Sequence, residues 1–448
     1  MIKHFFKAAL AGIAISQSTL ADKQPNILFI VIDDAGYDDF SYAGCKDWKT
    51  PHIDSIAKNG TTFTNGYVTA SVCGPSRAGL LTGRYQQSFG HEENITGGQA
   101  WKVPSEKFGL PTEIPTLGTL LQKKGYTTAV FGKWHLGEHE NFHPNNRGFD
   151  HFVGFLGGSR SFWPLDKASH GHKLRINDTV IKSPEYLTDY LGKATAEFIT
   201  QNKEKPFFAY LAYNAVHSPL HAKENDLQSL SHIDHNGRKL LGAMTVALDQ
   251  SIGLVLDTLK KHNLEENTLI VFSNDNGAAT YLKTDNGGLR GRKGTVWEGG
   301  LKVPFLVQWK GHIPANTTCS QPVNLLDAGS TFCKLAGYNA PAELDLPGTN
   351  LVSLANGKTI QRNLYWKRGN TSAIRNGQWK LITLKDKPTF LFDLNADPKE
   401  TNNLLKQEDS IANKLDSSLK QWEATLPAPL WKKKVADQYD TFLMKYWD

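Results

Sequence analysis

The sequence has few cysteines, little net charge and no internal repeats. Four cysteines in 448 residues are too few for a disulfide scaffold. Fifty lysines and arginines against 44 aspartates and glutamates leave the chain mildly basic, which argues against a nucleic-acid partner. The balance is compatible with a small anionic substrate held in a local basic pocket. No segment beyond the N-terminal residues is apolar enough to span a membrane. The hydrophobic content of 40% is ample for a folded core.

Residues 1–21 have the pattern of a secretory signal peptide. Lys3 and Lys7 give a basic start, a short apolar stretch follows, and Thr19-Leu20-Ala21 offers a small-x-small cleavage site. The apolar stretch is far shorter than the ~20 residues of a spanning helix. No cysteine follows it for a lipid anchor. We therefore expect an exported protein, periplasmic or secreted, with no membrane anchor after cleavage.

Short apolar runs alternate with helical patterns over most of the chain. Runs typical of strands buried on both faces lie at 26–32, 127–131, 206–213, 268–272 and 303–309. Helical patterns lie at 116–124, 183–201, 238–262 and 325–336. Ser183-Pro184 predicts the start of the second helix. This order predicts an α/β fold in which helices sandwich a mostly parallel central sheet.

The pattern changes near residue 340. Short strands are predicted at 363–368, 372–375, 379–383 and 389–393, and a helix at 409–426. A chain of 448 residues is also long for one domain. We expect a catalytic domain at 22–340 and a C-terminal subdomain at 341–448, with a small antiparallel sheet and a helix.

Charged and imidazole side chains follow four of the predicted strands. The first strand ends in Asp33-Asp34, the second in Gly132-Lys133-Trp134-His135, the third leads to His217, and the fourth ends in Asp275-Asn276. Any one of these could be a helix cap, a turn, a surface charge or a core histidine. Ligands gather at the carboxyl ends of strands in open α/β sheets, so the four together predict a site there.

Asp33, Asp34, Asp275 and Asn276 are all oxygen donors. Adjacent carboxylates at a strand end repel each other and need a cation. Oxygen ligands without histidine or cysteine favour Ca²⁺, with Mg²⁺ as the alternative, over zinc. These four residues are therefore candidates for a metal site, although Asp33-Asp34 could also cap a helix and Asp275-Asn276 could also form a turn.

Two segments resemble the signatures of the type I formylglycine-dependent sulfatases, in the alkaline phosphatase-like superfamily. The first is Cys73-Gly74-Pro75-Ser76-Arg77, in a run that continues to Arg84. In that family the cysteine is oxidised to formylglycine. The second is Gly132-Lys133-Trp134-His135-Leu136-Gly137. Glu298-Gly299-Gly300 and Phe392-Asp393-Leu394 also resemble flanking patterns of the family, so the resemblance covers nearly the whole chain.

The resemblance implies a sulfatase that uses covalent catalysis. The formylglycine aldehyde from Cys73 hydrates to a diol. One hydroxyl attacks the sulfur of a sulfate ester, and the other later expels the sulfate. The resemblance also implies that Asp33, Asp34, Asp275 and Asn276 hold the metal ion, and that the modified Cys73 completes its shell. Its formation requires a formylglycine-generating maturation enzyme.

The resemblance assigns the other catalytic roles to basic side chains. Arg77 would steady the diol, Lys133 would contact the sulfate, and His135 would handle the diol proton. His217 and Lys293 would contact the sulfate and protonate the leaving oxygen. Taken singly, each could be a solvated charge or a satisfied core histidine.

The remaining cysteines are Cys45, Cys319 and Cys333. A bridge between Cys319 and Cys333 is possible. Cys333 lies in an apolar helical pattern, however, and buried free thiols are at least as well supported.

Candidate substrate residues lie at 157–163 and 170–172. Arg160 could bind a second sulfate or a carboxylate, and Trp163 could stack on a sugar; both could also be ordinary loop residues. We expect a sulfated polysaccharide or oligosaccharide as substrate. The alternatives are an aryl or alkyl sulfatase, and a phosphodiester or phosphonate monoester hydrolase of the same fold. A non-catalytic protein that binds sulfated glycans, with Cys73 unmodified, is a further alternative.

Overall fold

The computed structural model describes residues 24–95, 103–279, 283–339 and 345–431. The predicted signal peptide at 1–21 lies outside the described residues.

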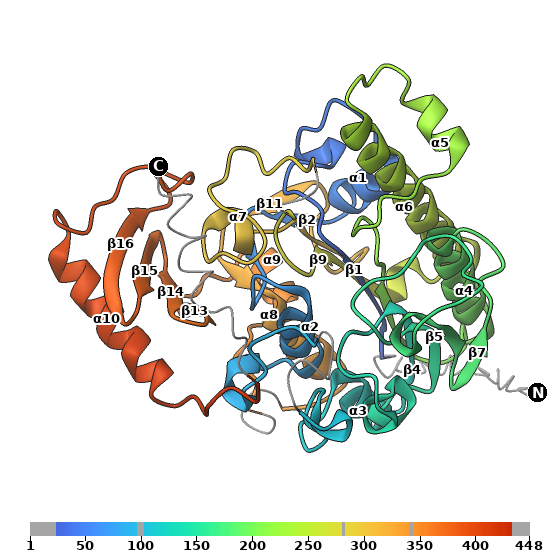
Figure 1. The fold of residues 1–448 in the computed structure, drawn as a ribbon, viewed down its shortest axis with the longest axis horizontal. Helices are drawn as coiled ribbons and strands as arrows, with labels where there is room; N and C mark the ends of the chain where they lie inside the picture. The colour runs from blue at the N-terminus through green and yellow to red at the C-terminus, as the bar shows by residue number, and fades with distance from the viewer. Residues whose placement is uncertain (1–23, 96–102, 280–282, 340–344, 432–448) are drawn as a thin grey trace, which may run out of the picture.

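A ten-stranded sheet forms the centre of the molecule (Figure 1). In spatial order its strands are β11 (Thr317–Cys319), β2 (Thr61–Phe63), β10 (Phe305–Gln308), β9 (Thr268–Asn274), β1 (Asn26–Ile32), β8 (Phe207–Ala212), β4 (Thr127–Lys133), β5 (His151–Phe155), β6 (Leu174–Ile176) and β7 (Thr179–Ile181). The five strands from β9 to β5 run parallel, which confirms the predicted sheet. The strand predicted at 303–309 is β10, which pairs antiparallel with β9.

Helices cover both faces of this sheet, and the side chains of β1 alternate between the two layers. Ile27, Phe29 and Val31 belong to one buried cluster, and Leu28 and Ile30 belong to the other. The first cluster includes side chains of α2 (Cys73–Thr82), α3 (Leu117–Gln122), α8 (Leu325–Leu335) and α9 (Leu351–Ala355). The second includes side chains of α1 (Pro51–Lys58), α4 (Leu187–Gln201) and α6 (Asn236–Lys261). The predicted sandwich is thus confirmed.

Helix α6 corrects one expectation. Within the described part of the chain, it is long and apolar enough to cross a membrane by length and composition. Of its most apolar stretch, 67% is buried inside the protein. Met244, Leu248 and Ile252 pack in the second cluster. The apolar character of α6 is therefore explained by its place against the sheet.

Helix α4 begins later than predicted. It starts at Leu187 with Tyr186 as its N-cap. The Ser183 hydroxyl instead donates to the carbonyl of Glu185 at 2.8 Å, which makes a local turn.

The C-terminal part contains the predicted antiparallel sheet. Its strands are β13 (Asn363–Arg368), β14 (Thr371–Asn376), β15 (Trp379–Leu384) and β16 (Lys387–Asp393). Helix α10 (Asp409–Glu423) covers one face of this sheet (Figure 1). On the other face, Trp366, Phe390 and Phe392 join the first cluster of the main sheet. The division of the chain at residue 340 stays a prediction.

The shorter elements are β3 (Gly66–Tyr67), β12 (Val323–Asn324), α5 (Glu224–Ser229) and α7 (Glu298–Leu301). All four cysteines are free, so the possible bridge between Cys319 and Cys333 is not formed. Cys45, Cys73 and Cys333 are buried and Cys319 is half-buried.

Candidate active site

The carboxyl ends of the parallel strands bring the predicted residues together. Asp33 and Asp34 follow β1, and Asp275 and Asn276 follow the neighbouring strand β9. The backbone amide of Asp275 donates to the carbonyl of Ile32 at 3.0 Å, so the two strand ends stay in register. All four side chains are fully buried.

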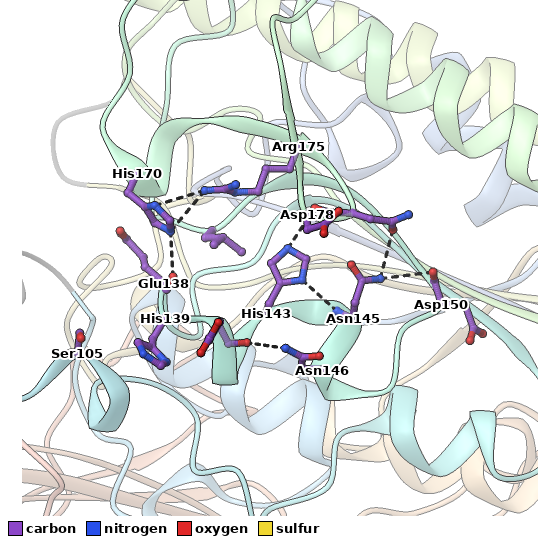
Figure 2. Close-up of a pocket in the computed structure, with 13 residues that line it drawn as sticks. Ser105, Glu138, His139, His143, Asn145, Asn146, Asp150, His170, Arg175 and Asp178 are labelled. Carbon is purple, nitrogen blue, oxygen red and sulfur yellow. Dashed lines mark hydrogen bonds between the residues drawn. The ribbon is translucent and has the colours of Figure 1, made fainter.

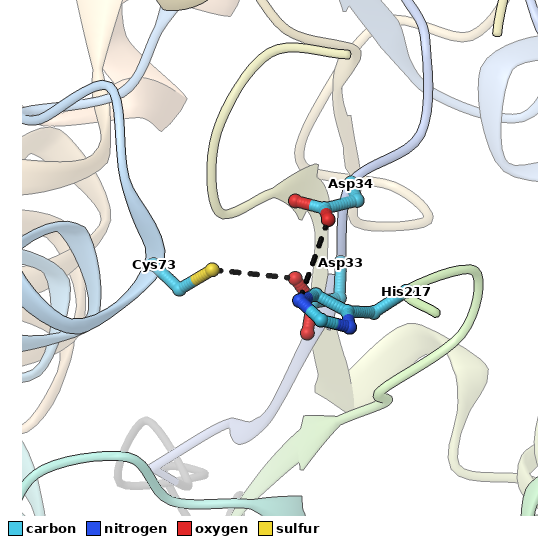
Figure 3. A group of neighbouring side chains, drawn as sticks. All are labelled: Asp33, Asp34, Cys73 and His217. Atoms are coloured by element: carbon cyan, nitrogen blue, oxygen red, sulfur yellow. Dashed lines mark hydrogen bonds and ion pairs between the residues drawn. The ribbon is translucent and has the colours of Figure 1, made fainter. Parts of the chain in front are cut away.

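Each carboxylate after β1 contacts a cation from another element. Lys133 Nζ, at the end of β4, donates to Asp33 Oδ2 at 2.6 Å. Lys293 Nζ contacts Asp34 Oδ1, and His217 Nε2 lies 3.5 Å from Asp34 Oδ2. Figure 3 shows that Asp33, Asp34 and His217 lie close together. The predicted residues of three strand ends thus form one cluster.

Cys73 is the first residue of α2 and points into this cluster (Figure 3). Its Sγ lies 2.9 Å from Lys293 Nζ and 3.6 Å from Asp33 Oδ1. Burial, together with Asp275, raises the pKa of the Cys73 thiol to about 12, although Lys133 and Lys293 oppose the shift. An unmodified thiol at this position is therefore protonated at neutral pH and a poor nucleophile.

Arg77 lies one turn further along α2 and joins the two strand ends. Its Nε and Nη2 each lie 2.8 Å from Asp275 Oδ2, and Nη2 lies 3.7 Å from Asp33 Oδ2. Its Nη1 donates to the carbonyl of Lys133 at 3.0 Å. The guanidinium is fully buried. Arg77 therefore fixes the positions of both carboxylates and of the end of β4.

The two histidines differ in their surroundings. His135 is 4% exposed, and its Nε2 lies 3.2 Å from the carbonyl of Ile95. Burial, together with Lys133 and Arg77, lowers the pKa of His135 well below its ordinary value, so its imidazole is neutral. Burial also lowers the pKa of His217, although Asp33 and Asp34 oppose the shift. The two rings are thus held in the site mainly as neutral groups.

The carboxylates respond to the same charges in different directions. Burial alone would raise the pKa of Asp33 and of Asp34, but Lys133, Lys293 and His217 outweigh it, and both values are lowered. Asp275 has the opposite balance, because burial and the charge of Asp33 raise its pKa to about 6. Asp33 and Asp34 are therefore ionised at neutral pH.

The oxygen atoms of the site fit a divalent cation. Asp275 Oδ1 and Asn276 Oδ1 are buried and have no hydrogen-bond partner in the described part of the chain. A buried oxygen without a partner is costly, and a cation would satisfy it. Ligand atoms of Asp33, Asp34, Cys73 and His217 also lie within 4.8 Å of one another. His217 is in this group although the sequence placed it only with the sulfate.

Arg160 is not part of this cluster. It follows β5 and lines a separate cavity of about 270 Å³, together with His172 and Lys173. His170 and Glu138 line another cavity, of about 1080 Å³, shown in Figure 2. None of the predicted catalytic residues lines either cavity.

Two buried contacts near Cys73 were missed by the sequence analysis. The Asn94 side chain accepts a hydrogen bond from the amide of Gly74 at 2.8 Å. Arg368, at the end of β13, donates to the carbonyl of Gly294 at 2.8 Å, next to Lys293. No local pattern marks either residue, because each acts across a contact between distant segments.

Comparison with known proteins agrees with this geometry. The sequence model of the family described as Sulfatase matches residues 25–338, and that described as N-sulphoglucosamine sulphohydrolase, C-terminal matches residues 292–425. Human N-acetylgalactosamine-6-sulfatase is 33% identical over 376 residues, which cover 78% of this chain and 70% of the human protein. Bovine arylsulfatase A is 31% identical, with 92% of this chain and 89% of that protein covered.

A solved structure extends the likeness over almost the whole chain. The crystal structure of Ps i-CgsB has a TM-score of 0.86 and 35% identity, and covers 94% of this chain and 97% of its own. A second structure of Ps i-CgsB, in complex with k-i-k-neocarrahexaose, has the same TM-score at 34% identity.

Proposed function

Because this chain belongs to the sulfatase family and is a sulfuric ester hydrolase, we propose that its substrate is a sulfated polysaccharide or oligosaccharide. The names of the similar proteins support a carbohydrate, since one is an N-acetylgalactosamine-6-sulfatase and another binds k-i-k-neocarrahexaose. The observation that carries the proposal is the buried cluster in which Cys73 lies between Lys293 and Asp33. A sulfate group placed there would meet cations on several sides.

The nucleophile in this proposal is formylglycine made from Cys73. Its hydrated form would supply a hydroxyl for attack on sulfur and a second hydroxyl that releases the sulfate. The high pKa of the unmodified thiol supports the proposal, because the thiol itself is a poor nucleophile here. Arg77, held by Asp275, would orient residue 73 from the next turn of α2.

The basic side chains divide the remaining work. Lys133 and Lys293 would bind sulfate oxygens and offset the charge that builds up on them. His135, neutral and buried, would accept the diol proton when the sulfate leaves. His217 would protonate the leaving oxygen, and Lys293, in contact with Cys73 Sγ, is the second candidate for that acid. Arg160 is proposed as a substrate-binding residue and is treated below.

Asp33, Asp34, Asp275 and Asn276 would hold a Ca²⁺ ion, with Mg²⁺ as the alternative, and residue 73 would complete the shell. The partnerless oxygens of Asp275 and Asn276 support this assignment. Such an ion supplies positive charge that lowers the pKa of a bound hydroxyl.

The proposal also covers export of the protein and modification of Cys73. The pattern of residues 1–21 supports export to the periplasm or the medium, and a formylglycine-generating enzyme would act on Cys73.

Mass spectrometry and sulfate release test the proposal together. In active protein, the tryptic peptide that ends at Arg77 should carry an aldehyde in place of the thiol. The same sample should release sulfate from a sulfated oligosaccharide faster than it cleaves a matched phosphodiester. An alkylatable Cys73 thiol in fully active protein would overturn the nucleophile. Faster cleavage of the phosphodiester would overturn the substrate class.

A further inference from the structure

Arg160 is a buried cation that has no counter-ion among the described residues. The residue is 4% exposed, and its Nε donates to the carbonyl of Ser161 at 3.1 Å. Its Nη1 is buried and has no hydrogen-bond partner among the residues that the structure describes. No ion pair to Arg160 is found in that part of the chain. Its other neighbour is the ring of Phe155, 5.9 Å from the guanidinium carbon.

The cavity beside Arg160 has a surplus of positive charge. Its volume is about 270 Å³, and Lys173, Lys182 and His172 also line it. The one carboxylate in its lining is Asp166, which is already paired with Lys182 at 2.7 Å. Among the described residues, the cavity lining therefore offers Arg160 and Lys173 no carboxylate other than the one already paired with Lys182.

This cavity lies at the same edge of the sheet as the catalytic cluster. Strand β5, which leads to Arg160, is the neighbour of β4, which ends in Lys133. A Cβ atom on Gly158 would lie 2.7 Å from Nε2 of His135, so the chain passes directly along that imidazole. A Cβ atom on Gly157 would lie 3.3 Å from Cδ2 of His172. The segment from Gly157 to Arg160 thus runs between the catalytic cluster and the cavity.

A buried guanidinium is costly unless an anion or several acceptors compensate it. Burial lowers the pKa of Arg160 only to about 10, so the side chain stays charged at neutral pH. A planar guanidinium with unused donors suits the oxygens of a sulfate or a carboxylate. The described residues offer Arg160 no such group, and the substrate can.

We propose that Arg160 and its cavity bind a second oxyanion of the substrate, a sulfate ester or a sugar carboxylate, beside the sulfate that is hydrolysed. This inference rests on the proposed carbohydrate substrate and narrows it to saccharides with at least two anionic groups. Arg160 is then a residue that determines specificity, and the catalytic cluster is the same for every sulfate ester.

Two matched pairs of saccharides test the inference. One pair is N-acetylglucosamine 6-sulfate and glucosamine 2-N,6-O-disulfate, in which an N-sulfate replaces the N-acetyl group. The other is N-acetylgalactosamine 6-sulfate and the disaccharide of chondroitin 6-sulfate, which differ by a uronate. Affinities are measured by calorimetry in Cys73→Ala protein, which cannot turn over. Arg160→Gln should weaken the dianionic member of at least one pair by roughly 10–100-fold, as for loss of a charged hydrogen bond. The monoanionic members should change by less than about threefold.

Two further variants separate a specific site from general effects. Lys193→Gln removes the same charge from an exposed ion pair with Glu185 outside the cavity, so it should change affinity little. Arg160→Lys keeps the positive charge and should retain part of the affinity for the dianionic saccharide. This variant tests the inference even if Arg160→Gln folds poorly. Equal losses in Arg160→Gln and Lys193→Gln, or equal losses for both members of each pair, would overturn the inference.

Crystals soaked in selenate give an answer that does not depend on the saccharide. An anomalous peak within hydrogen-bond distance of Arg160 is expected in the wild type and should vanish in Arg160→Gln. A cavity without selenate, together with unchanged saccharide affinities, would reject the site. Failure of the wild type to release sulfate from any saccharide would instead reject the proposed function. Anion binding at Arg160 would then be tested by the selenate experiment alone.

Discussion

At the scale of single residues, the buried cluster around Cys73 contains charged side chains of both signs. The carboxylates are Asp33, Asp34 and Asp275, and the cations are Arg77, Lys133 and Lys293. Because a buried charge is unstable without a partner, the loss of one member leaves another uncompensated. Variants in this cluster should therefore change binding, catalysis and stability together, and matched controls are needed to separate these effects.

Asp275→Ala should lose both the metal and stability. The substitution removes a proposed ligand and both 2.8 Å contacts of Arg77. We expect metal content to fall to background and the free energy of unfolding to fall by about 3–5 kcal/mol. Metal analysis and urea unfolding measure the two effects. Asp249→Ala, which removes a buried carboxylate bound to the amide of Ile53, should destabilise the protein and keep the metal. Full metal content in Asp275→Ala would contradict the site.

His217→Ala should separate substrates by their leaving groups. A sugar alkoxide needs a proton as it departs, whereas an activated phenolate does not. The loss in kcat/KM should therefore be larger on a sugar sulfate than on an aryl sulfate, by roughly 10²–10⁴-fold. Cys73→Ala should abolish both activities, because it removes the nucleophile. Equal losses for His217→Ala on both substrates would move the acid role to Lys293.

His91 should make the fold sensitive to mild acid. Its side chain is fully buried, neither ring nitrogen has a hydrogen-bond partner within the described residues, and burial lowers its pKa to about 3. Below pH 6.5 the imidazole of His91 binds a proton in the unfolded chain but stays neutral in the folded chain. The free energy of unfolding therefore decreases as the pH is lowered. The loss at pH 5 is about 2 kcal/mol, and it is absent above pH 6.5.

Urea unfolding of His91→Phe from pH 7 to pH 5 checks this value. The variant should lose about 2 kcal/mol less than the wild type over that range. His232→Phe, at an exposed histidine, should keep the slope of the wild type. Identical slopes for His91→Phe and the wild type would show that His91 is not held neutral.

At the scale of secondary-structure elements, a single side chain can link several elements. Arg368, at the end of β13, donates to Gly294 beside Lys293 and pairs with Glu93 at 2.8 Å. Asn94, the next residue, holds the amide of Gly74 at the start of α2. One arginine from the C-terminal sheet thus links the two segments that carry Lys293 and Cys73.

Arg368→Ala should therefore lower kcat by roughly 10–100-fold with little change in KM, because small shifts of catalytic groups are costly. Steady-state kinetics on an aryl sulfate measure the effect. Lys367→Ala is the matched control, since Lys367 pairs with Glu423 of α10 instead. A wild-type kcat in Arg368→Ala would show that the contacts of Arg368 with Gly294 and Glu93 do not position the site.

Sequence patterns predict these elements unequally. The strand Asn26–Ile32 is predicted to the residue, because a strand buried on both faces must be apolar throughout. The start of α4 is wrong by four residues, because Ser183 forms a turn of its own. The cluster around Asp33 was foreseeable from the parallel order of the strands. The contact of Arg368 with Gly294, 74 residues away, depends on how two sheets pack, and no local pattern encodes it.

The two sheets share one core at the scale of the whole molecule. Trp366 and Phe392 of the C-terminal sheet belong to the same buried cluster as Phe29 of the central strand β1. Lys380 of β15 is fully buried between Glu298 and Glu400, at 2.9 and 2.8 Å. Removal of the small sheet would expose this apolar face and leave Glu298 without its cation.

Residues 22–340 should for this reason fail to fold alone, although they were predicted as a separate domain. We expect no cooperative melting transition by circular dichroism and rapid cleavage in limited proteolysis. The chain from 22 to 448 is the control, and it should melt cooperatively and resist the protease. A sharp transition in the fragment would show that the C-terminal sheet is dispensable for folding.

The burial of Cys73 limits when its side chain can be modified. The side chain is 2% exposed at the start of α2, and every residue of that helix is buried. Under the proposed modification, an enzyme that oxidises Cys73 needs access to its side chain, so it would have to act before α2 docks against the sheet. In that proposal, the chain would become active in the interval between its synthesis and its folding. A molecule that folds first would keep its thiol, so the yield of active enzyme would depend on the relative rates of oxidation and folding.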